Sequence, residues 1–264
     1  MPFPEVRRVI FRKNPLDKVI CQLRFPPILR IDSEIPSDFQ DKVRKDFPNY
    51  SEVLEEVMVE IQSGKGSVPP DSLKQLIQSS QNKNYEFSSE DGFWKINLTR
   101  TFLALTSSKY ERWEQFKERL QLPLQTLIDT YAPAYFSRVG LRYIDVIKRS
   151  NLGLEATDWN ELLKPPILGV LASPDIGKQV RAFENKHDVG LSDQESAVRI
   201  ITRFVESANT GELCYMIDND FSNSNKTPID AVLEKLDFLN SRGSRLFQWC
   251  ITEKLHNAME PQLL

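Results

Sequence analysis

Apolar residues recur along this chain with two different periods, and each period predicts one kind of element. Alternation at every second residue predicts half-buried strands, whereas recurrence at three and four residues predicts amphipathic helices. Helical spacing predicts a helix from Pro36 to Phe47 and a long one from Tyr110 to Tyr131, which Pro123 should kink. In the same half, alternation predicts strands near residues 18–25, 57–61, 85–87, 94–98, 103–105 and 138–148.

The second half repeats this order coarsely. Thr227 and Pro228 predict the start of a helix whose apolar stripe continues to Met259, beyond a break or bend at 241–243. Before it, alternation predicts strands over 178–188, 196–206 and 213–218. Strands followed by a long helix are typical of the α+β class. We therefore expect an α+β fold: antiparallel sheet with long amphipathic helices packed on one face, in two loosely similar halves.

The chain length allows two domain arrangements. A chain of 264 residues can form one α+β domain with a substantial core, or two subdomains over residues 1–150 and 151–264.

The stretch from Arg138 to Lys148 has the clearest division of faces. Arg138, Gly140 and Arg142 should lie on one face of a strand. The two guanidinium-bearing residues would stand roughly 13 Å apart along the strand, with a glycine between them where a ligand or another chain could approach closely. The opposite face should be buried through Val139, Leu141 and Tyr143.

The same Arg-x-x-x-Arg spacing recurs at Arg199 and Arg203 in a second predicted strand. If the two strands were neighbours, four guanidiniums would line one sheet face. A guanidinium binds phosphate or carboxylate through two parallel hydrogen bonds, so this face would suit an anionic small molecule or an acidic protein partner. The alternative is that the arginines pair with carboxylates of the protein or face water.

Asp218 and Asp220 form a second candidate site. Two carboxylates two residues apart can share one face of a strand and hold Mg²⁺, Mn²⁺ or Ca²⁺. They precede a run rich in Ser and Asn, however, where aspartate is also expected simply as a turn former. A third interpretation is that they neutralise the arginines.

Composition excludes several functions. The formal net charge is −3 and the chain has only 10 glycines, so a basic footprint for non-specific nucleic-acid binding and glycine-rich phosphate loops are both disfavoured. The run from Ser63 to Ser67 leads into prolines rather than a helix, which predicts a linker. No dinucleotide, kinase or nucleophile-elbow motif occurs. No cofactor is therefore expected.

The cysteines and the first residues predict the compartment. Cys21, Cys214 and Cys250 are odd in number and lie in apolar-patterned segments, which favours reduced core thiols. The N-terminus lacks an apolar signal core, and no run of apolar residues is long enough to span a bilayer. We expect a cytoplasmic protein without membrane contact, whose oligomeric state the sequence leaves open.

Two runs are specific enough to suggest a family: Leu-Thr-Ser-Ser-Lys-Tyr-Glu-Arg-Trp at 105–113 and Arg-Val-Gly-Leu-Arg-Tyr-Ile at 138–144. With residues 19–28, 36–50 and 85–116, they resemble a sporadically distributed, uncharacterised prokaryotic protein family of no known function. The resemblance implies lateral transfer and a place in genomic islands, including phage-defence loci. It implies no catalytic residues.

These observations favour a binding or interaction module over an enzyme. The expected site is the face lined by Arg138, Arg142, Arg199 and Arg203, with an acidic or phosphorylated ligand or partner. The alternative is a metal-dependent phosphodiesterase or nuclease that uses Asp218 and Asp220. A third interpretation is a purely structural partner protein with an exposed apolar patch.

Overall fold

The computed structural model describes residues 2–54 and 83–263. Within them, nine strands form one antiparallel sheet in the order β3-β4-β5-β6-β2-β7-β10-β9-β8. The strands of this sheet are β2 (Leu16–Arg24), β3 (Asn49–Leu54), β4 (Lys83–Ser88), β5 (Trp94–Leu98), β6 (Phe102–Ser107), β7 (Arg138–Ile147), β8 (Glu184–Gly190), β9 (Ser196–Glu206) and β10 (Leu213–Asn223). A separate pair joins the chain ends through β1 (Val9–Phe11) and β11 (Pro261–Leu263).

The two halves of the chain build the two halves of this sheet in the same way. In each half the first strand of the large sheet lies at the centre, the last strand pairs with it, and the others follow outward in reverse order. The central strands β2 and β7 pair antiparallel, so the sheet runs without interruption from one half to the other. Each set of strands is followed by a long helix, α4 (Trp113–Tyr131) or α7 (Val232–Cys250).

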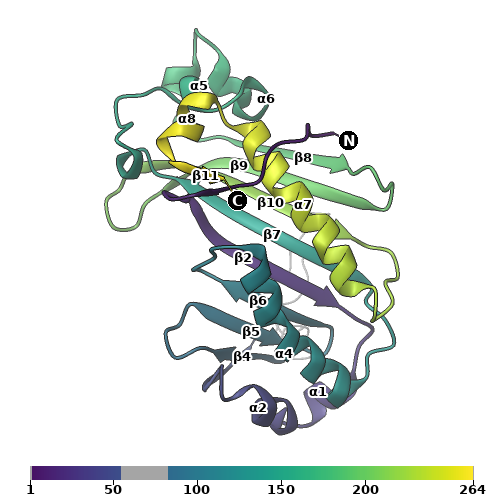
Figure 1. The fold of residues 1–264 in the computed structure, drawn as a ribbon. Coiled ribbons are helices and arrows are strands. Elements are labelled where there is room, and N and C mark those ends of the chain that lie inside the picture. Colours follow the sequence, from purple (N-terminus) through teal and green to yellow (C-terminus); the bar gives the residue numbers. More distant parts are fainter. Residues whose placement is uncertain (1, 55–82, 264) are drawn as a thin grey trace, which may run out of the picture.

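Both long helices cover the same face of the sheet, which confirms the expected α+β class (Figure 1). They are amphipathic, and their buried residues join the core formed by the inward faces of the strands. We call the other side of the sheet the open face. The shorter helices are α1 (Leu29–Ser33), α2 (Ser37–Val43), α5 (Trp159–Leu162), α6 (Pro165–Leu168) and α8 (Glu253–Ala258).

The face division predicted for β7 is confirmed. Val139, Leu141 and Tyr143 are buried beneath the helices. Arg138 and Arg142 are only partly buried and belong to the open face. Alternation predicted this correctly because each strand of the sheet has one face against the helices, whereas no helix of residues 2–54 and 83–263 covers the other face.

Several predicted boundaries are wrong. The helix expected to start at Thr227 and Pro228 begins only at Val232, because Thr227 forms an antiparallel bridge with Phe136 instead. The predicted strand over 178–188 begins only at Glu184, because a 3₁₀ turn occupies 177–179. Strand β10 continues to Asn223 instead of ending near Asp218. Helix α7 passes through 241–243 without a break, because Gly243 lets the helix approach the sheet closely: a Cβ there would lie 2.8 Å from Cε2 of Tyr143. The predicted strand at 57–61 and the linker from Ser63 to Ser67 lie outside the described residues.

The N-terminal segment crosses the helix-covered face in front of α7 before it enters β2 (Figure 1). Phe3 is buried against Trp249, with ring centroids 5.5 Å apart. Arg8 donates two hydrogen bonds to Glu114 at the start of α4, of 2.6 and 2.8 Å. The segment is therefore tied to both long helices.

The three cysteines are free and buried, as expected for core thiols. Among the residues that the structure describes, no helix is both long and apolar enough to cross a membrane.

Candidate functional site

The two arginine strands lie in one sheet, but they are not neighbours. Strand β10 runs between β7 and β9. Its Asp220 is opposite Arg142 on one side and opposite Arg199 on the other. The predicted condition, that the two strands are neighbours, is therefore not met. Directly opposed residues point to the same face, however, so the arginines share one face with a strand of aspartates between them.

Asp220 and Asp218 hold the two arginines of β7. Arg138 donates from Nη2 to both carboxylate oxygens of Asp220, at 2.7 and 2.8 Å. Arg142 binds Asp218 through Nε and Nη2, at 2.7 and 2.5 Å. The pKa of Arg142 is raised, chiefly by the hydrogen bond to Asp218.

The arginines of β9 pair with the edge strand β8. Arg199 binds Asp188 through two hydrogen bonds of 2.8 and 3.3 Å. These contacts raise the pKa of Arg199 and lower that of Asp188. Arg203 forms a looser ion pair with Glu184, at 3.6 Å. Every arginine of the predicted site therefore has a carboxylate partner, as the alternative interpretation anticipated.

Gly140 has a different role from the one expected. The guanidinium of Arg138 folds over it, so that a Cβ at this position would lie 2.2 Å from Nη1 of Arg138. The sequence predicted that a ligand or another chain would approach this glycine. In the structure the Arg138 side chain does so, because it crosses Gly140 to reach Asp220 and Gln22.

A trough runs across the open face between two rows of charged side chains. Beneath it lies a row of small or neutral residues on successive strands, with Gln22 opposite Gly140, Gly140 opposite Ser222, and Ser222 opposite Ala197. The Arg138 guanidinium covers Gly140, so this glycine does not itself line the trough. Four strands at about 4.8 Å spacing give this row a length of roughly 14 Å. The trough encloses about 650 Å³ and is lined by Ile20, Gln22, Arg24, Arg138, Arg142, Asp188, Ala197, Arg199, Asp220, Ser222 and Ser224.

Four arginines and two aspartates line the trough, and Asp218, which binds Arg142, neutralises a third arginine from outside the lining. The surplus is therefore one positive charge, and it belongs to Arg24. Its Nε donates to Gln22 at 3.0 Å, and within the described ranges it has no carboxylate partner. Arg203 does not line the trough. The sequence alternation that placed Cys21 and Leu23 in the core also placed Arg24 on the open face, so this signal could have found it.

The metal interpretation of Asp218 and Asp220 meets an obstacle in this geometry. A cation would have to displace the guanidiniums of Arg142 and Arg138 from the two carboxylates. In the part of the chain that the structure describes, no three His, Cys, Asp or Glu side chains come together in a way that could hold a metal ion.

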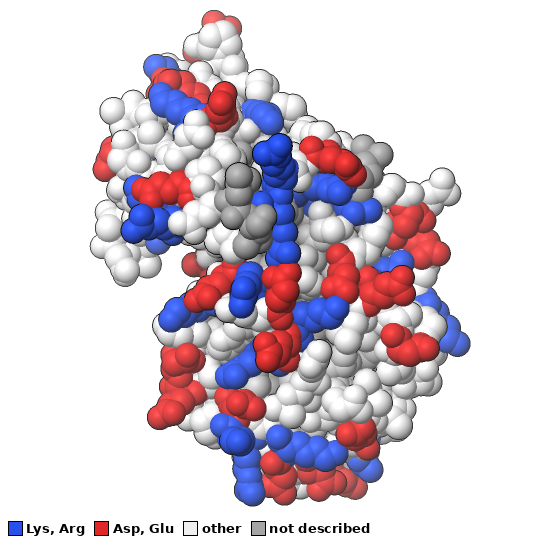
Figure 2. Space-filling model, viewed as in Figure 1, with Lys and Arg blue, Asp and Glu red and all other residues white. Residues whose placement is uncertain are grey.

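The helix-covered face differs in its charge distribution. Lys and Arg side chains lie interspersed with Asp and Glu across it (Figure 2). Lys117, for example, pairs with Asp237 at 2.6 Å between the two long helices.

Comparison with known proteins gives no family for this chain. No family model matches the sequence, and a search of curated proteins finds no relative.

Proposed function

We propose that this protein is a binding module whose trough on the open face receives an acidic or phosphorylated group of a small molecule or of a protein partner. One observation supports this most directly: four guanidiniums line the trough, and that of Arg24 has no carboxylate partner among the described residues. The proposal includes the predicted cytoplasmic location, where phosphorylated and acidic ligands are abundant.

The ion pairs within the trough hold the arginines in place without using all their donors. A guanidinium has five N–H groups, whereas Arg138 uses Nη1 and Nη2, and Arg142 uses Nε and Nη2. An anion could therefore bind the remaining N–H groups while the aspartates keep the guanidiniums oriented. Because the arginine side chains are already ordered, less conformational entropy is lost on binding.

Phosphate and carboxylate groups fit this arrangement better than other anions do. Both are matched by the planar fork of a guanidinium, and a charge-assisted hydrogen bond is about twice as strong as a neutral one. The small side chains of Ser222 and Ala197 leave room for the ligand between the charged rows. The resemblance to proteins of genomic islands predicts that a protein partner, if there is one, is encoded nearby.

The proposal is tested by titration calorimetry with inorganic pyrophosphate and with a phosphoserine peptide. Loss of one charge-assisted contact, of about 1.5–3 kcal/mol, predicts that Arg24→Ala weakens binding roughly tenfold to a hundredfold. Arg44→Ala is the matched control, since Arg44 is an exposed arginine of the α2 end that pairs only with Asp41 among the described residues. If neither probe binds, or if both variants bind as the unmodified protein does, the proposal is wrong.

A further inference from the structure

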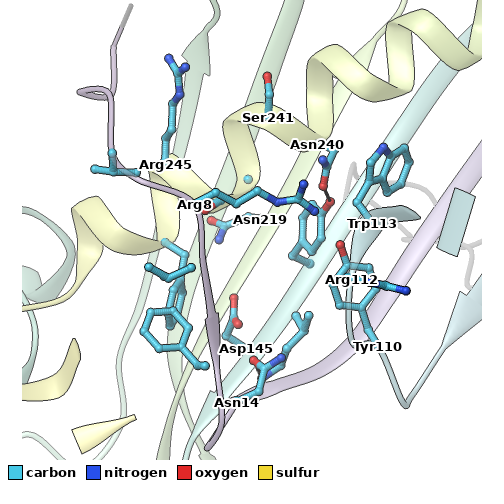
Figure 3. A pocket seen from close by; sticks show the side chains of 18 of the residues that line it. Arg8, Asn14, Tyr110, Arg112, Trp113, Asp145, Asn219, Asn240, Ser241 and Arg245 are labelled. Atoms are coloured by element: carbon cyan, nitrogen blue, oxygen red, sulfur yellow. Dashed lines mark hydrogen bonds between the residues drawn. The ribbon is translucent and has the colours of Figure 1, made fainter. Parts of the chain in front are cut away.

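A second cavity lies on the other side of the sheet, beneath the N-terminal segment. It has a volume of about 350 Å³, which is within the usual range for small-molecule sites. Strands β7 and β10 form its floor, the beginning of α4 and the middle of α7 form its sides, and residues 6–16 cover it (Figure 3).

Two polar side chains on the floor have no partner. Asp145 is 5% exposed and Asn219 is 1% exposed. Oδ1 of Asn219 is fully buried and has no hydrogen bond. The carboxyl group of Asp145 faces the cavity, and across residues 2–54 and 83–263 no hydrogen bond or ion pair reaches it. The register sets them diagonally on neighbouring strands, since Asp145 is opposite Ile217 and Asn219 is opposite Tyr143. Both belong to the cavity lining (Figure 3).

Neighbouring polar groups in the same cavity are satisfied. The hydroxyl of Tyr143 donates to Oδ1 of Asn240 at 2.8 Å, and Oδ1 of Asn14 accepts from the backbone N–H of Leu16 at 3.1 Å. Arg8 is held by Glu114. Buried polar groups in folded proteins are nearly always paired, so a bound ligand with hydrogen-bond donors would complete the Asn219 oxygen and the neighbouring carboxyl group of Asp145 together.

The walls determine the shape of that ligand. Five of the residues that line the cavity are aromatic: Phe11, Tyr110, Trp113, Tyr143 and Phe247. Such walls favour a flat molecule, because aromatic side chains stack on planar groups. The floor then calls for hydrogen-bond donors, since the Asn219 oxygen can only accept and a carboxyl group accepts through at least one oxygen. A planar molecule most readily presents such donors in its own plane as N–H groups.

We propose that this cavity binds a small planar molecule through an amidine-type edge, an amino group beside a ring or imino nitrogen, which pairs with Asp145 and Asn219. A carboxyl group is complementary to this edge in either protonation state. As a carboxylate it accepts two N–H bonds, and as an acid it accepts one and donates one to an unprotonated ring nitrogen. This proposal does not depend on the trough of the open face.

The Asp145 side chain can take part in both hydrogen-bonding patterns, as a carboxylate and as an acid. Burial, with a smaller contribution from Asp218, raises the pKa of Asp145 to about 8. The acid form therefore predominates at neutral pH in the free protein, and a cationic amidine would favour the carboxylate. The other charged side chains that line the cavity are Arg8, Glu111, Arg112 and Arg245.

The test uses two probes that share the edge, 2-aminopyrimidine and benzamidine, with n-butylamine as an ammonium of different shape. Calorimetry and melting curves of the whole chain should show both planar probes binding and n-butylamine not binding. Asp145→Leu should abolish binding of both. Asp145→Asn keeps an acceptor and a donor but loses the charge. It should weaken the binding of benzamidine at least tenfold and the binding of 2-aminopyrimidine much less.

Glu86→Gln serves as the matched control, because Glu86 is a partly buried carboxylate of the open face whose partners are Ser51, Lys95 and Asn97. It should bind both probes as the unmodified protein does. Melting curves of each variant show whether it is folded. Three outcomes overturn the proposal: neither planar probe binds, n-butylamine binds as well as they do, or Asp145→Leu is folded and still binds. A crystal soaked with the probes that shows only ordered water on Asp145 and Asn219 also overturns it.

Discussion

The unpaired carboxyl group of Asp145 should leave a measurable signature in the pH dependence of stability. An unfolded aspartate has a pKa of about 3.9, whereas burial raises that of Asp145 to about 8 in the folded protein. The folded state therefore binds one proton more than the unfolded state between these two values. Stability from this group is fully present below pH 4 and is lost as pH rises to about 8.

The magnitude follows from the size of the shift. Each pH unit in this window is worth at most about 1.4 kcal/mol for one proton. From pH 5 to pH 8 the loss is at most about 4 kcal/mol, and partial hydration of the cavity should reduce it to about 2–3 kcal/mol. Asp145→Asn has no carboxyl proton to lose at this position. The unfolding free energy of this variant should therefore not show this decline as pH rises.

The assay is urea unfolding of the unmodified protein and Asp145→Asn at pH 5, 6, 7, 8 and 9. Other ionisable groups contribute equally to both proteins, including Glu114, whose pKa is lowered to about 2 mainly by its hydrogen bond from Arg8. The difference in unfolding free energy should grow in favour of the variant up to pH 8 and then become constant. If the two curves stay parallel from pH 5 to pH 8, the carboxyl group is solvated or paired and the reasoning is refuted.

Two glycines offer further tests of close packing. Gly140→Ala should push the Arg138 guanidinium away from Asp220 and destabilise the protein by no more than about 1 kcal/mol, because the end of this flexible side chain can move aside. A double-mutant cycle with Arg138→Ala should show that the two changes are not additive; additive effects would contradict the overlap. Gly243→Ala should destabilise by about 1–2 kcal/mol in urea unfolding despite the helix propensity of alanine, because its Cβ meets the Tyr143 ring. A more stable Gly243→Ala would show that α7 can shift outward.

Local patterns in the sequence predicted most elements, because the spacing of apolar residues shows which face of a half-buried strand or helix is buried. The strand over 196–206 was predicted with its bounds, and the face division of 138–148 was correct. Strand β8 was predicted to begin too early because it is an exposed edge strand, whose charged residues give no alternation. The break expected at Gly243 is absent. This glycine does not form a turn but allows α7 to pack closely against Tyr143 of the sheet.

Pairing between distant segments could not be predicted in the same way. Nothing in the sequence places β10 between the two arginine strands, and so the partners of Arg138 and Arg142 were offered only as one of several interpretations. Asp220 was assigned to a strand end because turn-forming residues follow it, yet the strand continues to Asn223, which is buried and hydrogen-bonded to Ser196.

The cavity on the helix-covered face had a signal that sequence reasoning missed. Asp145 has the same parity as Val139, Leu141 and Tyr143, so a charged residue was already assigned to a buried face. A buried aspartate without an obvious partner is unusual enough to mark a candidate site. Asn219 could not be found in this way, because its proximity to Asp145 depends on the pairing of β7 with β10.

The central claim, that the trough of the open face binds an anionic group, is tested most directly by NMR of arginine side chains. Nε–Hε signals would be followed while inorganic pyrophosphate is added at low ionic strength, where surface electrostatics are least screened. The account predicts saturable shifts for Arg24, Arg138, Arg142 and Arg199, and none for Arg44. Unchanged signals at these four arginines, or equal shifts at Arg44, would contradict it.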